Sequence, residues 1–346
     1  MSFVLLTIAV FSCKGIQTNN QLLENINKTM VYFNYTKNEL CLLDIDTGAV
    51  LKSHKLDFDV QQYVIDKHGF RSEWYYSNND KNIYLMRVYT DWNNFTNNNT
   101  RIYQINIETF ESSEIFYSTE DFHNFCVFDG YIYLLSYVEP SSGQSNLEKN
   151  YIVKYNLLDE TQEIINFNTL LPENEQIHAH DFYVTENTII LNGWYRRLEL
   201  KNIYRYDLTT EMITILDENA TRFSIIEDKI VYRKNDIELG YNSLGFETVK
   251  IIGSNLLLHD LTNGNTIVLP DVINSGILTY FLINKDIIVF SREHKTIMTL
   301  INKFRLFPNY DTILKDYYIA DVHGNAQRKI FQNRDSISIL GVMDNM

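Results

Sequence analysis

The stretch NIYRYDLTTEMITIL, residues 202–216, has the pattern of a β-hairpin. Apolar and polar residues alternate on both sides of the turn at Asp207 to Thr210, and such alternation is typical of half-buried strands. The same phrase occurs six times along the chain. Each copy turns at an Asp or Asn, whose short side chain favours turns by bonding to nearby backbone. The six turn residues are Asp44, Asn106, Asn156, Asp207, Asp260 and Asp321.

Two further short apolar segments precede each hairpin, so each repeat contains four expected strands. The first and second strands are joined by tight polar turns such as Asp129-Gly130. The repeats are about 50 to 60 residues long, which exceeds the roughly 40–45 residues of a WD40 blade. A repeat on this scale predicts a propeller or another repeat architecture.

The two ends of the chain hold complementary parts of one repeat. Residues 30–55 supply a second, third and fourth strand without a first, and residues 336–342 supply a first strand alone. We therefore predict an all-β fold, a six-bladed β-propeller of four-stranded antiparallel blades, closed by pairing the C-terminal strand with the N-terminal strands. A β-sandwich or a solenoid built from the same hairpins is the alternative, although a solenoid would carry capping repeats at both ends.

The strand phrasing of residues 30–346 resembles the TolB-like six-bladed propellers found in many bacterial envelope lipoproteins. The signatures of WD40, kelch and sialidase propellers are absent from the sequence. The resemblance implies a scaffold and an envelope location, whereas an activity must be argued from a site.

The amino-terminal segment predicts export. Residues 3–12 form an apolar run that is too short to span a bilayer and suits a signal peptide. Val10-Phe11-Ser12-Cys13 resembles a lipobox, although Phe11 is bulky for that motif and no Lys or Arg precedes the run. We expect a signal peptide over 1–13 that ends at a lipidated Cys13, a tether over 14–29, and one propeller domain over 30–346. The expected location is the bacterial cell envelope; a secreted protein and a packed terminal segment are the alternatives.

Composition excludes some partners. The net charge of −14 argues against binding of nucleic acid, which needs clustered Lys and Arg, and against adhesion to an anionic membrane. We expect a monomer that meets the membrane only through a lipid anchor. Cys41 and Cys126 lie in different repeats, each within an expected strand, so we expect no disulfide. No motif for a cofactor or a metal is present.

The longest connections join the second and third strands, on the face where the chain also enters the next blade. They include residues 90–100, 139–150, 196–201, 235–248 and 292–315. Loops that vary on a rigid scaffold carry function, so this decorated face is the expected binding face. The candidate ligand-binding residues there are Trp92, Asp121, His123, His178, His180, Trp194, Arg196, Arg197, Arg292 and His294.

These side chains suit an anionic or sugar-like ligand in a central funnel. Each also has a structural explanation. His178 and His180 have the spacing of a metal pair but no third ligand nearby in sequence, so we predict no metal. Arg196 and Arg197 can clamp a carboxylate or pair with an acidic neighbour.

We therefore predict a non-enzymatic ligand-binding or interaction module that meets a protein, peptide or glycan through its decorated face. The alternative is a hydrolase or lyase that uses His123, His178 or His180 as acid–base groups. Asp121 with His123 could form half of an acid–base dyad, but any mobile loop offers such pairs, so no residue is assigned as catalytic.

Overall fold

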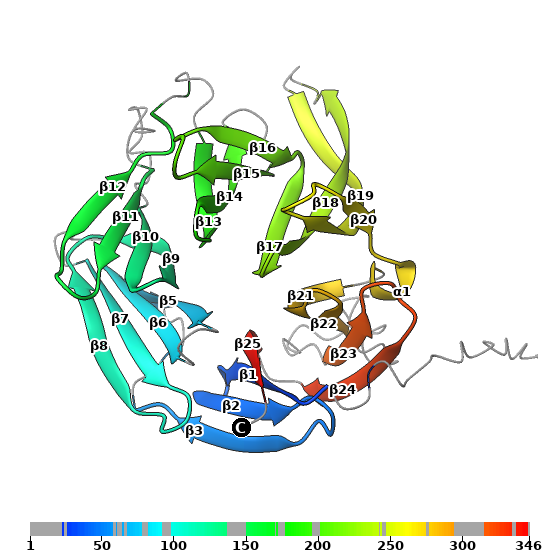
Figure 1. Cartoon of the computed structure of the whole chain (residues 1–346), viewed down its shortest axis with the longest axis horizontal. Helices are drawn as coiled ribbons and strands as arrows, with labels where there is room; N and C mark the ends of the chain where they lie inside the picture. Colours follow the sequence, from blue (N-terminus) through cyan, green and yellow to red (C-terminus); the bar gives the residue numbers. More distant parts are fainter. Residues whose placement is uncertain are drawn as a thin grey trace, which may run out of the picture.

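The computed structural model is a six-bladed β-propeller (Figure 1). It describes residues 23, 26–57, 60, 64–65, 68–77, 82–91, 98–136, 150–169, 171, 177–195, 201–241, 243, 247–274, 277–293, 315–333 and 337–344. Each blade is an antiparallel sheet, and the predicted all-β class and blade number are confirmed. One blade differs from the prediction because it has five strands. Cys13 and the expected signal peptide lie outside the described residues.

Blade 1 closes the ring. β1 (Lys28–Asn34) lies between β25 (Ile337–Asp344) and β2 (Glu39–Asp44), and β3 (Val50–Lys55) is outermost. β1 and β25 are antiparallel, with Lys28 opposite Asp344 and Asn34 opposite Ile337. The predicted pairing of the two ends of the chain is thus confirmed (Figure 1).

The remaining blades follow in chain order, each with its first strand nearest the axis, except in blade 2. Blade 2 contains β4 (Val64–Ile65), β5 (His68–Ser77), β6 (Asn82–Asp91), β7 (Asn99–Asn106) and β8 (Ser112–Ser118). Its axial strand is β5, and the two-residue strand β4 pairs with the beginning of β5. Blade 3 contains β9 (Phe122–Phe128), β10 (Tyr131–Ser136), β11 (Ile152–Asn156) and β12 (Gln162–Ile165). Blade 4 contains β13 (Ile177–Val184), β14 (Thr188–Tyr195), β15 (Lys201–Asp207) and β16 (Ile213–Asp217).

Blade 5 contains β17 (Ala220–Ile226), β18 (Lys229–Tyr241), β19 (Glu247–Asp260) and β20 (Thr266–Val268). The four-residue helix α1 (Asp271–Asn274) leads into blade 6. Blade 6 contains β21 (Ile277–Asn284), β22 (Ile287–Glu293), β23 (Lys315–Asp321) and β24 (Gln327–Asn333). Among the described residues, no helix is long and apolar enough to cross a membrane.

The core is divided among the gaps between neighbouring blades. Six clusters of buried apolar side chains are found, and each joins two adjacent blades. In β2, Leu40 and Leu42 pack toward blade 2, whereas Cys41 and Leu43 pack toward blade 6. Successive side chains of a strand point to opposite faces, and here both faces are covered. This explains why the middle strands read as continuous apolar runs.

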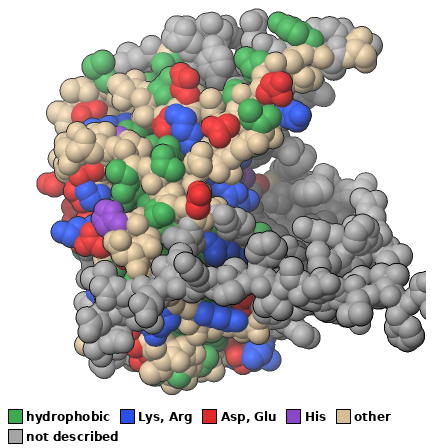
Figure 2. All heavy atoms as spheres, turned by 90° about the vertical axis from the view of Figure 1, so that its right-hand side faces the viewer, with side chains coloured by type: hydrophobic (Ala, Val, Ile, Leu, Met, Phe, Trp, Pro, Cys, Tyr) green, Lys and Arg blue, Asp and Glu red, His purple; other side chains and the backbone are tan. Residues whose placement is uncertain are grey.

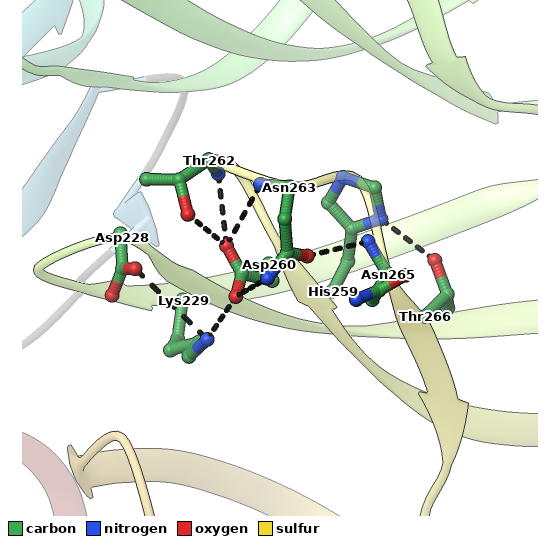
Figure 3. Close-up of polar contacts among 8 residues, drawn as sticks. All are labelled: Asp228, Lys229, His259, Asp260, Thr262, Asn263, Asn265 and Thr266. Carbon is green, nitrogen blue, oxygen red and sulfur yellow. Dashed lines mark hydrogen bonds and ion pairs between the residues drawn. The ribbon is translucent and has the colours of Figure 1, made fainter.

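The six turn residues act as the sequence predicts. In each outer hairpin a side-chain oxygen of the Asp or Asn accepts hydrogen bonds from one or two backbone N–H groups of the turn, at 2.7 to 3.2 Å. Asp260 also contacts the Lys229 ammonium and accepts a bond from the Thr262 hydroxyl (Figure 3). The expected tight turn at Asp129-Gly130 is confirmed too, because both residues have positive φ, as a type I′ turn requires.

A long hairpin projects from blade 5. Residues 235–248 were expected to form a loop, but β18 runs to Tyr241 and β19 starts at Glu247. The two strands pair along their whole length, with Leu239 opposite Val249 and Ile237 opposite Ile251. Exposed apolar side chains lie on this projection: Leu239 is 55% exposed and Tyr241 is 76% exposed. Figure 2 shows hydrophobic side chains at the surface of the face that it views. We call this projecting hairpin the arm. Its apolar side chains are exposed because no neighbouring blade packs against them.

Candidate functional site: a pocket on the propeller axis

The inner strands of all six blades line one cavity of about 630 Å³ on the axis of the ring. A volume between about 300 and 1,000 Å³ is usual for a small-molecule site. The cavity is lined by parts of β25, β5, β9, β13, β17 and β21, with Asn192 added from β14, Lys201 from β15 and Tyr35 from the residue after β1. Polar side chains line part of it and aromatic side chains line the rest.

Three consecutive inner strands carry a β-bulge where they line this pocket. In β9, Phe122 pairs with Ser136 and Asn124 with Leu135, so His123 is the extra residue. The same irregularity makes His180 the extra residue of β13 and Arg222 the extra residue of β17.

A bulge adds a residue without a partner in the ladder and redirects side chains. His180 and Asp181 therefore both line the pocket, although neighbours in a regular strand point to opposite faces.

The strand opposite the bulge in blade 4 approaches unusually closely. A Cβ added to Gly193 would lie 2.6 Å from the backbone oxygen of His178 and 2.8 Å from the Ile177 side chain. Only glycine fits at this distance, so Gly193 lets β14 pack against the irregular part of β13.

A hydrogen bond across two blades positions the carboxylate. Asn124 donates from Nδ2 to Oδ1 of Asp181 over 2.8 Å, which joins the inner strands of blades 3 and 4. Burial raises the pKa of Asp181 to about 7, and the nearby Glu73 carboxylate raises it further, against opposing effects of Asn124 and Lys201. Asp181 thus changes charge near neutral pH.

The imidazole beside it has the opposite shift. Nε2 of His180 lies 3.2 Å from the Lys201 ammonium. Burial lowers the pKa of His180 to about 4, and repulsion from Lys201 and His123 adds to the effect. His180 is therefore neutral at physiological pH, and its Nε2 accepts from Lys201, because an ammonium can only donate.

Aromatic side chains form the apolar part of the wall. The ring of Tyr75 lies 6.1 Å from that of Phe125 and 6.5 Å from that of Tyr183, measured between centroids. Burial raises the pKa of Tyr183 to about 12, so its hydroxyl stays protonated. Tyr280 donates its hydroxyl to the backbone oxygen of Arg222, which ties blade 6 to the bulge of blade 5.

The structure brings together His123 and His180 from the residues that the sequence suggested. His178 does not line the pocket, because the bulge at His180 breaks the regular spacing on which the expected histidine pair depended. Asp121 precedes β9 and is half-buried outside the lining. Arg292 lies over the rings of Phe290 and Tyr318 in blade 6, also outside the lining.

The remaining candidates are not placed. Trp194 belongs to β14, but its side chain lies outside the described residues, as do Trp92, Arg196, Arg197 and His294. No group of three or more His, Cys, Asp or Glu side chains that could hold a metal ion occurs among the described residues.

The candidates chosen from the sequence did not include Glu73, Asn124, Asp181, Lys201 and Arg222, all of which line the pocket. A signal for most of them exists. Each inner strand of blades 2 to 6 has a pocket-lining residue directly before an aromatic one, and an alignment of the repeats on that aromatic would have found it. The five pairs are Trp74-Tyr75, Asn124-Phe125, Asp181-Phe182, Arg222-Phe223 and Tyr280-Phe281.

Comparisons with known proteins show a shared fold at low identity. No family model matches the sequence, and no curated protein matches it significantly. TolB from Acinetobacter baumannii is 12% identical with a TM-score of 0.48, over 92% of this chain and 65% of TolB. An oligogalacturonate lyase from Vibrio parahaemolyticus is 12% identical with a TM-score of 0.43, over 75% and 72% of the two chains. A structure of a nidogen/laminin complex matches at 8% identity with a TM-score of 0.49, over 91% of this chain and 97% of that chain. The six-bladed propeller that the predicted likeness to TolB-like proteins implies is confirmed by the sheet order of this structure itself.

Proposed function

We propose that this propeller is a binding module that holds a small polar molecule in the pocket on its axis. The observation that carries the proposal is the convergence of charged groups from blades 2, 4 and 5 on one cavity of small-molecule size: Glu73, Asp181, Lys201 and Arg222 all line it. Aromatic walls beside a few convergent polar groups are typical of ligand sites.

Binding is favoured over histidine catalysis by the state of His180. A general base works best when its pKa is near the working pH, whereas His180 has a pKa of about 4. Its ring also lies against the Lys201 ammonium. A residue held in this way can accept a hydrogen bond but is a poor proton acceptor in a reaction.

The test is a thermal-shift screen of the purified protein against separate sets of amino acids, sugars, nucleotides and organic acids. A ligand at 100 times its dissociation constant adds about 2.7 kcal/mol to the free energy of unfolding, which raises the melting temperature by a few degrees. Lys201→Met should abolish the shift, whereas Lys154→Met, outside the pocket lining, should leave it unchanged. A screen in which no small molecule of any set gives a Lys201-dependent shift would refute the proposal.

A second candidate function is acid–base catalysis through Asp181. Its pKa of about 7 matches such a role at neutral pH. The two functions are separated by incubating the bound molecule with the protein and following its conversion. Turnover that Asp181→Asn abolishes while binding persists would establish an enzyme; a molecule recovered intact would leave a binding module.

The location and the macromolecular partner remain predictions. We propose that the protein is anchored in the bacterial envelope through Cys13, on the support of the apolar run over residues 3–12. Cys13→Ser should move it from the membrane fraction to the soluble fraction of its host and remove labelling by palmitate. A membrane-bound and unlabelled protein in both forms would contradict the anchor. The protein, peptide or glycan partner of the decorated face is likewise a proposal.

A further inference from the structure

The charges around the pocket are separated into two poles. Glu73 on β5 and Asp181 on β13 both line the pocket, and burial first and then the Glu73 carboxylate raise the pKa of Asp181. Lys201 on β15 and Arg222 on β17 both line the pocket, and burial first and then the Arg222 guanidinium lower the pKa of Lys201. Asp181 and Lys201 also act on each other, so the carboxylate and ammonium poles are adjacent. The ring of charges therefore runs from acidic in blade 2 to basic in blade 5.

The balance of charge disfavours the anionic ligand that the sequence suggested. Arg292 lies outside the pocket lining, whereas Glu73 and Asp181 lie within it. A purely anionic ligand that reached Lys201 and Arg222 would face two carboxylates. A purely cationic ligand would face the opposite problem.

Aromatic rings also line the pocket. Trp74, Phe125, Phe223, Tyr280 and Phe281 line the pocket together with the charged groups. Such rings contribute apolar contact area and favour flat or branched apolar groups. The aromatic and charged side chains together suit a ligand that has an apolar body and two oppositely charged groups.

We infer that the axial pocket binds a free α-amino acid with a large apolar side chain, its ammonium group at Glu73 and Asp181 and its carboxylate at Lys201 and Arg222. This assignment rests on the proposed function, because it names the ligand of the same pocket. Both ends of the ligand form charge-assisted hydrogen bonds, which are stronger than neutral ones.

Proton release gives the assignment a specific signature. An ammonium group placed beside Asp181 stabilises the carboxylate and lowers its pKa from about 7, so binding at pH 7 releases protons. The titratable groups that act on Asp181 or respond to it are Glu73 on β5, Cys126 on β9, Lys201 on β15 and Tyr280 on β21. Burial raises the pKa values of Cys126 and Tyr280, so these two stay protonated at pH 7 and do not contribute.

The test is calorimetric titration of the whole protein with L-phenylalanine, with N-acetyl-L-phenylalanine, which lacks the cation, and with L-phenylalanine amide, which lacks the anion. We expect the parent amino acid to bind at least about tenfold more tightly than either blocked form, since a hydrogen bond to a charged group contributes about 1.5–3 kcal/mol. We also expect the heat of binding at pH 7 to change with the ionisation enthalpy of the buffer. Asp181→Asn should abolish that dependence.

Two variants test whether Glu73 and Lys201 cause the preference for L-phenylalanine over its blocked forms. Glu73→Gln should reduce the penalty for the N-acetyl form, and Lys201→Met should reduce the penalty for the amide. Lys154→Met is the control and should change neither penalty, and circular dichroism verifies that each variant is folded. If a blocked form binds as tightly as L-phenylalanine, the assignment is wrong.

The outcomes also separate this assignment from the proposed function. If L-phenylalanine and L-leucine both fail to bind while another small molecule gives a Lys201-dependent shift, the amino-acid assignment fails and the binding module stands. If no small molecule binds, both fail together.

Discussion

The Lys201 ammonium lies 3.2 Å from Nε2 of His180, and the next residue along β13 is the carboxylate Asp181. A base whose pKa is lowered and an acid whose pKa is raised therefore sit side by side in one strand. Both shifts favour the uncharged form of the side chain. Within a pocket lined by charged side chains, His180 and Asp181 therefore both have pKa values shifted toward their neutral forms.

The two shifts oppose each other in the dependence of stability on pH. Between about pH 4 and 6.5 the unfolded state binds more protons at His180 than the folded state, so the contribution of His180 to stability rises with pH. Between about pH 4 and 7 the folded state binds more protons at Asp181, so that contribution falls with pH. In melting temperatures measured from pH 4 to 7.5, we expect the Asp181→Asn variant to become more stable relative to wild type as the pH rises. We expect the His180→Asn variant to become less stable relative to wild type over the same range.

The exposed carboxylate Glu111 provides the control, and Glu111→Gln should leave the shape of the wild-type profile unchanged. Profiles of the same shape for Asp181→Asn and His180→Asn would show that the two groups do not have opposite shifts.

Gly193→Ala should destabilise the fold and disturb the pocket together. The added Cβ would overlap the backbone of His178, and forcing extra atoms into a packed site costs about 1–3 kcal/mol. Denaturant unfolding measures the loss. Gly240→Ala is the matched control, because its Cβ would meet only the Thr248 hydroxyl at 3.5 Å, an ordinary contact. Equal stability of the two variants would contradict the close approach of β14 to β13.

Deletion of residues 336–346 should open blade 1, since it removes β25 and leaves the inner edge of β1 unpaired. We expect a large fall in melting temperature and partial recovery when a synthetic peptide of residues 336–346 is added. A scrambled peptide should have no effect. An unchanged melting temperature after deletion would disprove closure by β25.

A single substitution tests the same strand more gently. Met343→Ala removes a buried side chain from the cluster between blades 1 and 2, at a cost of about 2–5 kcal/mol. Met212→Ala, at a position 58% exposed, should cost far less. Chemical denaturation of the two variants gives the comparison, and equal losses would place Met343 outside the core.

Asp260 should be the most sensitive of the outer turn residues, because it joins the turn to Lys229 on the second strand of its blade (Figure 3). Lys229 and the turn hold the pKa of Asp260 well below its usual range, so this stabilisation is present above about pH 4 and is lost as the pH falls. Asp260→Asn keeps an oxygen for the turn and loses the charge contact, whereas Asp260→Ala loses both. We expect melting temperatures at pH 7 to fall in the order wild type, Asn, Ala, and the opposite order would refute the role of the turn bonds.

The architecture could be predicted because its determinants are local. Asp207 and its five equivalents mark turns by their own side-chain chemistry, and Asp129-Gly130 marks a type I′ turn. Closure of the ring followed from counting strands at the two ends, and β25 pairs with β1 as that count requires.

The site could not be predicted in the same way because it depends on register. The bulges at His123, His180 and Arg222 depend on how two strands pair, so they cannot be recognised from the pattern of apolar and polar residues in a single strand. The contact of Asn124 with Asp181 joins residues 57 positions apart on different blades. The hairpin at the ends of β18 and β19 was predicted as a loop because it extends beyond the blade, where Leu239 and Tyr241 are exposed and no core packs against them.

Pairing of β1 with β25 also has a consequence for synthesis. On the ribosome β1 emerges before the other blades and must wait for β25 while the five remaining sheets are made. At about 5–20 residues per second the wait is on the order of tens of seconds. During that interval the apolar strand Met30 to Phe33 can pair with β2 on one edge, but its other edge is covered only in the finished ring. The edge of β1 that faces β25 therefore stays unpaired until the last strand of the ring is made.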